Sequence, residues 1–162
     1  MRPEETPAVR KLANHCYLAL GSNLQTPERQ LRQALAKLRR LPGTAVLNIA
    51  KFYRNPAQGR KAQPDFYNTV ILIQTRLKPQ QLLSHCQAIE KQQGRIRRQR
   101  WGSRTLDIDI LFYKDIKIKT PKLIIPHPRY SAREFVLIPL IEVASSTLLK
   151  QIQPIPLLQS DY

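Results

Sequence analysis

The order of short apolar runs and helix-like periodic segments is the feature that most restricts what this chain can fold into. The apolar run from Cys16 to Leu20 ends at Gly21, a pattern typical of a buried strand that stops at a tight turn. Thr26 and Pro27 then predict a helix start with a hydroxyl cap. The leucines that follow recur at helical spacing, at Leu31, Leu35, Leu38 and Leu41. A strand followed by an amphipathic helix is therefore expected.

The middle of the chain continues this alternation. Apolar residues predict strands at 44–53 and 66–75, joined by an irregular polar stretch. A second helix is expected from Pro79 to Gly94, and an alternating strand at 105–113. The order strand, helix, strand, strand, helix, strand matches the ferredoxin-like βαββαβ pattern. We therefore expect an α+β fold with an antiparallel sheet, helices on one side of it, and a short C-terminal extension.

The two ends of the chain complete this prediction. Extended pieces at 116–118 and 123–125 and a helical region at 131–143 follow the last core strand. Residues 1–15 lack periodicity and predict a flexible N-terminal leader. Because 162 residues suit one compact domain, a single domain is expected at 16–162.

The charge balance indicates an anionic partner. The chain has 27 Lys and Arg against 11 Asp and Glu, a formal net charge of +16. Nucleic acid, an anionic membrane and a phosphorylated small substrate all fit that charge. No apolar run predicts a membrane span or a signal peptide, so we expect a cytoplasmic protein without a membrane partner. Cys16 and Cys86 lie in apolar-patterned segments and are expected to be buried free thiols.

Two acids on the last core strand are the strongest chemical signal. Strand alternation places Asp107 and Asp109 on one face and Leu106, Ile108 and Ile110 on the other. Five arginines come shortly before the acids: Arg95, Arg97, Arg98, Arg100 and Arg104. Because Mg²⁺ prefers one or two carboxylates plus phosphate oxygens, this combination predicts a site for a metal-bound polyphosphate. The alternative is a pair of exposed acids in salt bridges with nearby arginines.

The same segment resembles a known family signature. The run Arg100-Trp101-Gly102-Ser103-Arg104-Thr105-Leu106-Asp107-Ile108-Asp109-Ile110-Leu111 is similar to that of the 6-hydroxymethyl-7,8-dihydropterin pyrophosphokinases. Further segments match the family in order and spacing, at 19–24, 52–54, 63–68, 89–95 and 125–128. Since the resemblance spans residues 17–144, residues 16–162 are expected to form one pyrophosphokinase domain.

The resemblance implies a reaction. Pyrophosphate would pass from ATP, the co-substrate, to 6-hydroxymethyl-7,8-dihydropterin, giving AMP and the pterin pyrophosphate for tetrahydrofolate biosynthesis. Two Mg²⁺ ions would be held by Asp107 and Asp109, which would act in catalysis together with Arg95 and Arg104. The expected step is in-line attack of the hydroxymethyl oxygen on the β-phosphorus, without a covalent nucleophile. That Asp109 also assists deprotonation of the hydroxyl is a further hypothesis.

The resemblance also implies two substrate pockets. ATP contacts fall on Gln87, Ile110, Lys122, His127 and Arg133. Pterin contacts fall on Asn55, Pro56, Gln58, Phe66, Asn68, Trp101 and Phe135. Within the second set, Phe66 and Phe135 would sandwich the pterin ring, and Asn68 would read its polar edge.

Several of these residues also have purely structural interpretations. An isolated phenylalanine such as Phe66 or Phe135 is more often a core residue, and the neighbouring Asn68 and the order of the motifs favour the functional interpretation. His127, between two prolines, fits a residue that caps a turn as well as one that binds phosphate. Glu90 fits either a supporting role behind the site or a solvated position on the second helix.

A nucleic-acid-binding module is the alternative from another class of function. An RNA recognition motif shares the order of strands and helices, but it carries an aromatic-rich strand for base stacking, and no such segment occurs in this sequence. A basic surface that binds a polyanion in addition to catalysis is compatible with the charge of +16. ATP and the pterin are the expected partners, and a monomer is expected.

Overall fold

The computed structural model describes residues 13–56, 64–94 and 105–152. Its elements follow in the order β1 (Asn14–Ser22), α2 (Pro27–Leu38), β2 (Thr44–Ile49), β3 (Tyr53–Asn55), β4 (Phe66–Thr75), α3 (Pro79–Gln92), β5 (Asp107–Tyr113), β6 (Ile118–Lys119), β7 (Ile124–Ile125), the 3-10 turn η1 (Tyr130–Ala132), α4 (Glu134–Val143) and α5 (Ser146–Gln151). The predicted α+β class with its antiparallel sheet is confirmed.

The central sheet is antiparallel and has β1 in its interior. Its strand order is β2-β4-β1-β5, and β3 pairs with the beginning of β4, beyond the end of β2. Gly21, near the end of β1, pairs with Asn68 of β4 on one side and with Asp107 of β5 on the other. The strands β6 and β7 form a separate hairpin. One end of the sheet thus collects the end of β1 and the beginnings of β4 and β5.

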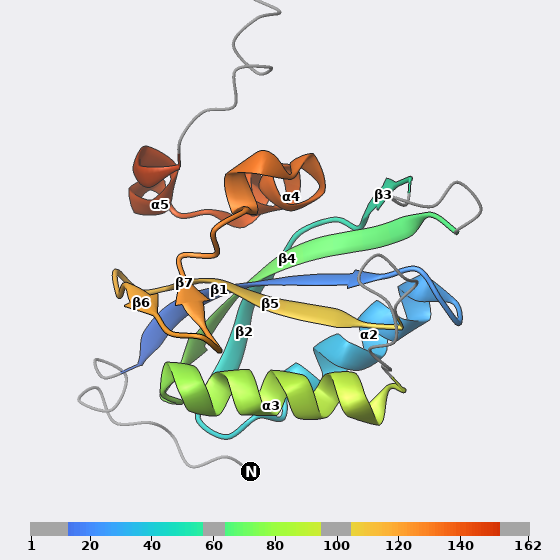
Figure 1. The fold of residues 1–162 in the computed structure, drawn as a ribbon, viewed down its shortest axis with the longest axis horizontal. Coiled ribbons are helices and arrows are strands. Elements are labelled where there is room, and N and C mark those ends of the chain that lie inside the picture. Colours follow the sequence, from blue (N-terminus) through green and yellow to red (C-terminus); the bar gives the residue numbers. More distant parts are fainter. Residues whose placement is uncertain (1–12, 57–63, 95–104, 153–162) are drawn as a thin grey trace, which may run out of the picture.

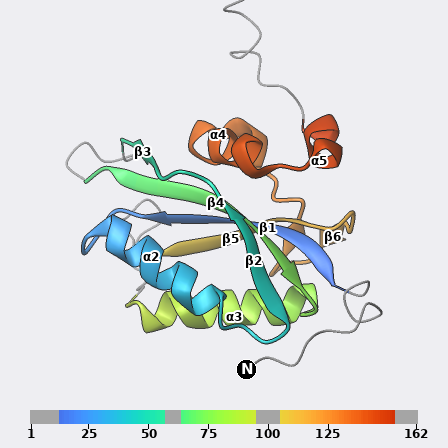
Figure 2. The same cartoon turned by 180° about the vertical axis from the view of Figure 1, so that it is seen from behind.

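Helices cover both faces of the sheet, as Figure 1 shows. Cys16, Leu18 and Leu20 of β1 pack into a cluster with α2 and α3 that contains Leu31, Leu35, Leu38, Leu82 and Ile89. Tyr17 and Ala19 point the other way, into a cluster with α4 and α5 that contains Val136, Leu137, Leu140 and Leu148. The same two layers are seen from behind in Figure 2. The two core helices therefore share one face, as predicted, and the C-terminal extension covers the opposite face.

The segment predicted as one strand at 44–53 forms two strands instead. The pairing of β2 with β4 shifts register between Val46 and Asn48, a bulge that bends the strand. β2 ends at Ile49, and the chain stays beside β4 through a hydrogen bond of 3.0 Å from Ala50 N to Val70 O. β3 then begins at Tyr53. The pairing with β4 is thus interrupted between Ile49 and Tyr53, and the prediction of one strand was wrong because apolar periodicity within a segment does not show where pairing with another strand stops.

The start of α2 and both ends of the chain also differ in detail from the predictions. α2 begins at Pro27 as predicted, but Thr26 makes no side-chain capping bond. Thr26 has a left-handed φ of 59°, whereas a capping side chain reaches the first turn from extended backbone. β1 begins at Asn14, two residues before the predicted strand, and α5 was not predicted, although Ser145 Oγ caps it by accepting from Leu148 N at 3.1 Å.

Two further predictions concern the cysteines and membrane-spanning segments. Cys16 and Cys86 are free and buried, as predicted, and burial raises the pKa of both thiols, that of Cys86 to about 12. Among the described residues, no helix has the length and apolar character needed to span a membrane.

Candidate active site

One row of residues crosses the sheet at the end where β1 stops. Asp107, Gly21, Asn68 and Tyr53 are successive cross-strand partners on β5, β1, β4 and β3. Cross-strand partners project from the same face with Cβ atoms about 5 Å apart. This face is the one that carries α4, because Ala19 and Val70, two residues along their strands, belong to the α4 cluster. An acid and an amide therefore lie on either side of a glycine.

Gly21 leaves the space that Asn68 uses. A Cβ atom at position 21 would lie 2.5 Å from Asn68 Oδ1, far inside van der Waals contact. The absence of a side chain therefore lets the amide of Asn68 lie against β1.

The acid pair occupies the predicted face of β5. Ile108 and Ile110 are buried in the cluster under α2 and α3, so Asp107 and Asp109 project from the opposite face, where both are half-buried. Two carboxylates that project from one strand face supply the hard oxygen ligands that Mg²⁺ prefers, and their partial exposure leaves room for water or phosphate oxygens as further ligands. The chemistry and placement of this donor pair thus fit a divalent cation.

His127 lies beside the acid pair and is fixed by two hydrogen bonds. The backbone N–H of His127 donates to Leu111 O at 2.9 Å, and the ring nitrogen Nδ1 accepts from the backbone N–H of Arg129 at 3.1 Å. Burial lowers the pKa of His127, the nearby charges of Arg133 and Arg129 lower it further, and Asp109 opposes them. The ring is therefore neutral near pH 7, with its proton on Nε2, because Nδ1 acts as an acceptor. His127 caps a turn and still presents a donor.

Arg133 and Phe135 mark the beginning of α4. The guanidinium carbon of Arg133 lies 5.9 Å from the centre of the Phe135 ring, in a cation–π contact. Phe135 is only partly buried, although it packs against the cluster under α4. Its ring thus has a core contact and an accessible part, and the charge of Arg133 reaches both Phe135 and His127.

The predicted pterin residues of β3 and β4 form a small polar group. Asn68 Nδ2 donates to Asn55 Oδ1, and Asn55 Nδ2 donates to Pro56 O at 3.2 Å. Phe66 pairs with Asn55 across the two strands and is half-buried. Asn68 itself is buried, with 7% of its surface exposed. The structure therefore brings Asn55, Pro56, Phe66 and Asn68 together beside Gly21.

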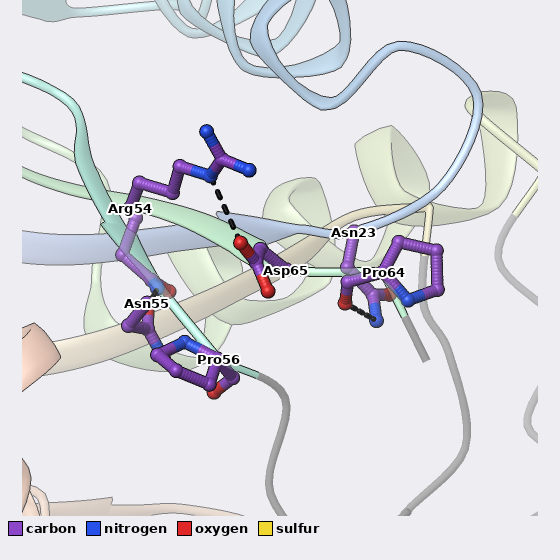
Figure 3. A network of polar contacts seen from close by, with 7 residues as sticks. Asn23, Arg54, Asn55, Pro56, Pro64 and Asp65 are labelled. Carbon is purple, nitrogen blue, oxygen red and sulfur yellow. Dashed lines mark hydrogen bonds and ion pairs between the residues drawn. The ribbon is translucent and has the colours of Figure 1, made fainter. Parts of the chain in front are cut away.

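Contacts between neighbouring segments hold the beginning of β4 in place, as Figure 3 shows. Arg54 Nε forms an ion pair of 2.9 Å with Asp65 Oδ2. Asn23, just after β1, donates from Nδ2 to Pro64 O at 3.1 Å. The segment that leads into Phe66 is thus tied both to β3 and to the end of β1.

Of the remaining predicted ATP contacts, Ile110 lies on β5, whose outer edge is the one that does not pair with β1. Ile108 N donates to Glu90 Oε2 of α3 at 2.8 Å, and Leu111 O accepts from His127 N. The backbone of Ile110 lies between these two contacts, while its side chain is buried in the core. Gln87 on α3 and Lys122 in the turn between β6 and β7 are both exposed.

Several predicted site residues lie outside the described residues: Arg95, Arg104, Gln58 and Trp101. Conversely, sequence reasoning missed Gly21 and Tyr53 as members of the row that contains Asp107 and Asn68. Their membership follows from strand register, which a sequence without known strand pairing does not display.

Comparison with known proteins identifies relatives over most of the chain. Residues 17–145 match the family model described as 7,8-dihydro-6-hydroxymethylpterin-pyrophosphokinase. A protein of Haemophilus influenzae named 2-amino-4-hydroxy-6-hydroxymethyldihydropteridine pyrophosphokinase is 46% identical over 137 residues, 85% of this chain and 86% of the relative. Proteins of the same name are 44% identical in Pseudomonas aeruginosa, over 79% of each chain, and 43% identical in Bacillus subtilis, over 80% of this chain and 78% of the relative.

Proposed function

The chain belongs to the 7,8-dihydro-6-hydroxymethylpterin-pyrophosphokinase family, and on this premise we propose that it transfers pyrophosphate from ATP to 6-hydroxymethyl-7,8-dihydropterin in folate biosynthesis. The products are AMP and the pterin pyrophosphate. The observation that carries the proposal is the row in which Asp107 and Asn68 flank Gly21, because it sets the expected phosphate end and the expected pterin end side by side on one face.

In this proposal Asp107 and Asp109 would hold two Mg²⁺ ions. Bound magnesium would supply positive charge that neutralises the phosphates of ATP. The support is the pair of half-buried carboxylates on one face of β5.

ATP binds along the outer edge of β5. The neutral His127 donates from Nε2 to a phosphate oxygen, and Arg133 adds a fixed cation. The backbone of Ile110 hydrogen-bonds the base in this proposal, and the support is its position between the Glu90 and His127 contacts on the outer edge of β5. Gln87 on α3 and Lys122 between β6 and β7, both exposed, complete the nucleotide contacts in this proposal.

The pterin binds over β3 and β4. Phe66 and Phe135 take opposite faces of its ring, and Asn68 with Asn55 pairs with its polar edge, because an amide pair offers both donors and acceptors. Pro56 contributes its carbonyl region, and Gln58 and Trp101 belong to the proposal on the strength of the family resemblance alone.

The reaction is a direct displacement. The hydroxymethyl oxygen forms a bond to the β-phosphorus of ATP. The bond from that phosphorus to the oxygen it shares with the α-phosphorus breaks, and AMP leaves with this oxygen. Arg95 and Arg104 stabilise the charge on the transferred group. Asp109 assists removal of the hydroxyl proton, and full turnover of Asp109→Asn with normal ATP and metal binding would exclude this role.

Domain, partner and location predictions complete the proposal. Residues 16–162, with Asn14 and His15 added as the first residues of β1, form one pyrophosphokinase domain after the leader. The protein acts as a cytoplasmic monomer, with ATP and the pterin as its partners.

Product analysis tests the function. The full chain is incubated with ATP, Mg²⁺ and 6-hydroxymethyl-7,8-dihydropterin, and nucleotides and pterins are separated by chromatography. AMP and pterin pyrophosphate are expected, and both are lost in Asp107→Ala and without metal. Formation of ADP, or no turnover, would reject the proposal.

A further inference from the structure

Glu90 reaches the acid pair from the opposite side of β5. It lies in the last turns of α3, and only 5% of its surface is exposed. Its Oε2 accepts a hydrogen bond of 2.8 Å from the N–H of Ile108, the residue between Asp107 and Asp109. A buried carboxylate is thus attached to the backbone that joins the two acids.

The position of β5 explains why this N–H needs such a partner. β5 is the last strand in the order of the sheet and pairs with β1 on one side. Buried N–H groups on the other edge of a strand remain costly unless something else accepts from them. Since a charged acceptor makes a stronger bond than a neutral one, Glu90 holds this stretch of backbone firmly.

A second observation places the charge of Glu90 near the acid pair. The thiol of Cys86 lies one turn before Glu90 on α3, in the cluster under the sheet. Burial is the main reason that the pKa of Cys86 is raised, and the charges of Glu90 and Asp109 both add to the rise. Glu90 therefore acts on this thiol from the same helix, and Asp109 acts on it from the other face of β5.

We propose that Glu90 is a positioning residue for the cation site, which holds the backbone at Ile108 so that Asp107 and Asp109 present their carboxylates to the same ions. The physical reason is that the dihedral angles on either side of Ile108 set the directions of both side chains. A rotation of this backbone would spread the two carboxylates apart. The inference rests on the proposed function, because it assumes that the acid pair binds metal.

Two variants separate the hydrogen bond from the charge. Glu90→Asp keeps the charge but shortens the side chain by one methylene group, which withdraws the carboxylate from Ile108 N. Glu90→Gln keeps an oxygen acceptor at full length and removes the charge. Gln93→Ala is the matched control, because it removes two buried hydrogen bonds near the same end of α3 that join Gln93 to Gln30 of α2.

The experiment is a titration of the ¹⁵N-labelled full chain with Mn²⁺ alone, followed by the broadening of backbone amide signals near the acid pair. Loss of an interaction that supports metal ligands costs about 10-fold or more in metal affinity. Glu90→Asp is expected to weaken Mn²⁺ binding by about that factor and to speed hydrogen exchange at the amide of Ile108. Glu90→Gln is expected to stay closer to the wild type in both readings, and Gln93→Ala to leave both unchanged.

The outcomes are distinct. If Glu90→Asp binds Mn²⁺ as the wild type does, or if Glu90→Gln is the weaker binder of the two, the positioning role is wrong. A loss of Mn²⁺ affinity without faster exchange at Ile108 would overturn it as well. Asp107→Asn tests the premise separately: if the wild type shows no Mn²⁺ broadening that Asp107→Asn removes, the metal site of the proposed function fails instead.

Discussion

Single residues set the geometry of the candidate site, and Gly21 does so by lacking a side chain. Because a Cβ atom there would meet Asn68 Oδ1 at 2.5 Å, the glycine keeps the amide of Asn68 directed toward Asn55. His127 acts in a complementary way, since its hydrogen bond from Arg129 N fixes which ring nitrogen carries the proton. These contacts fix which donors and acceptors the candidate site presents.

Gly21→Ala is expected to raise the KM for the pterin, because the new methyl group displaces Asn68. Loss of one hydrogen bond between neutral groups corresponds to roughly 3- to 10-fold in affinity. Steady-state kinetics at saturating ATP measure the change. If the methyl group acts through Asn68, adding Gly21→Ala to Asn68→Ala has little further effect, and additive losses would contradict this explanation.

His127 is expected to titrate below its usual pKa of about 6.5, because burial and two arginines disfavour the charged ring. In the metal-free protein, a titration followed by NMR of the ring protons measures this pKa. Arg133→Gln should raise it by removing a like charge, and Asp109→Asn should lower it by removing an attractive one. A shift in the reverse direction for either variant would show that these charges do not govern the ring.

The same pKa shift has a consequence for stability. The unfolded chain takes up the proton at a higher pH than the folded protein does, so the contribution of His127 to folding is present above the unfolded pKa and is lost as the pH falls through the folded pKa. Denaturant titrations across this range should therefore show a smaller loss of stability in His127→Asn than in the wild type. Equal losses would mean that other groups dominate.

The two thiols offer a simple test of the core. Both are buried and have raised pKa values, so they should not react with a thiol reagent in the native protein near pH 8. The same reagent should react with both after addition of denaturant. Rapid reaction of either thiol under native conditions would contradict its burial between β1 and α3.

At the scale of elements, α4 covers the middle of the face that ends in the candidate site. Its apolar residues pack on β1 and β4, and its first residues carry Arg133 and Phe135 to the edge of that cover. Lys51 N also donates to Glu142 Oε2 at 3.0 Å, which ties α4 to the chain between β2 and β3. A loss of α4 packing therefore affects the placement of the candidate residues Arg133 and Phe135 as well as stability.

Leu137→Ala is expected to lower the free energy of unfolding by about 2–5 kcal/mol, the usual cost of a cavity at a fully buried leucine. Its neighbour Ile138 is 42% exposed, so Ile138→Ala should cost about 0.5 kcal/mol or less. Urea titrations of both variants provide the comparison. Similar costs for the two would mean that α4 does not pack on the sheet through Leu137.

For the molecule as a whole, the net charge of +16 is the property that the proposed reaction explains least. A positive field attracts ATP, which carries several negative charges, whereas the pterin is uncharged. The basic surface is also compatible with a polyanion as a further partner, and retention on nucleic acid that falls with salt would detect one.

Salt is expected to act selectively on the two substrates. Because ions screen the attraction between opposite charges, the KM for ATP should rise by roughly threefold or more from about 0.05 M to about 0.5 M salt. The KM for the pterin should change little over the same range and serves as the internal control. Equal changes for both substrates would indicate a general effect of salt on the fold.

Apart from the division of the 44–53 segment into β2 and β3 and the presence of α5, the sequence determined the type and order of the main elements, because the spacing of apolar residues within each segment is a local property. The leucines of α2 and the alternation in β5 were sufficient to predict a helix, a strand and the face that carries Asp107 and Asp109. The family signature supplied the candidate residues. The roles of Arg95, Arg104, Gln58 and Trp101 stay predictions, since these residues lie outside the described ranges.

Only the tertiary structure decided which residues meet. Gly21 joins Asn68 to Asp107 because three strands far apart in the sequence pair in one register, and a shift of one residue would turn each side chain to the other face. The bond from Ile108 to Glu90 likewise depends on how α3 packs against the edge of β5. Such contacts arise from the mutual fit of distant segments, which the spacing of residues within any one segment does not contain.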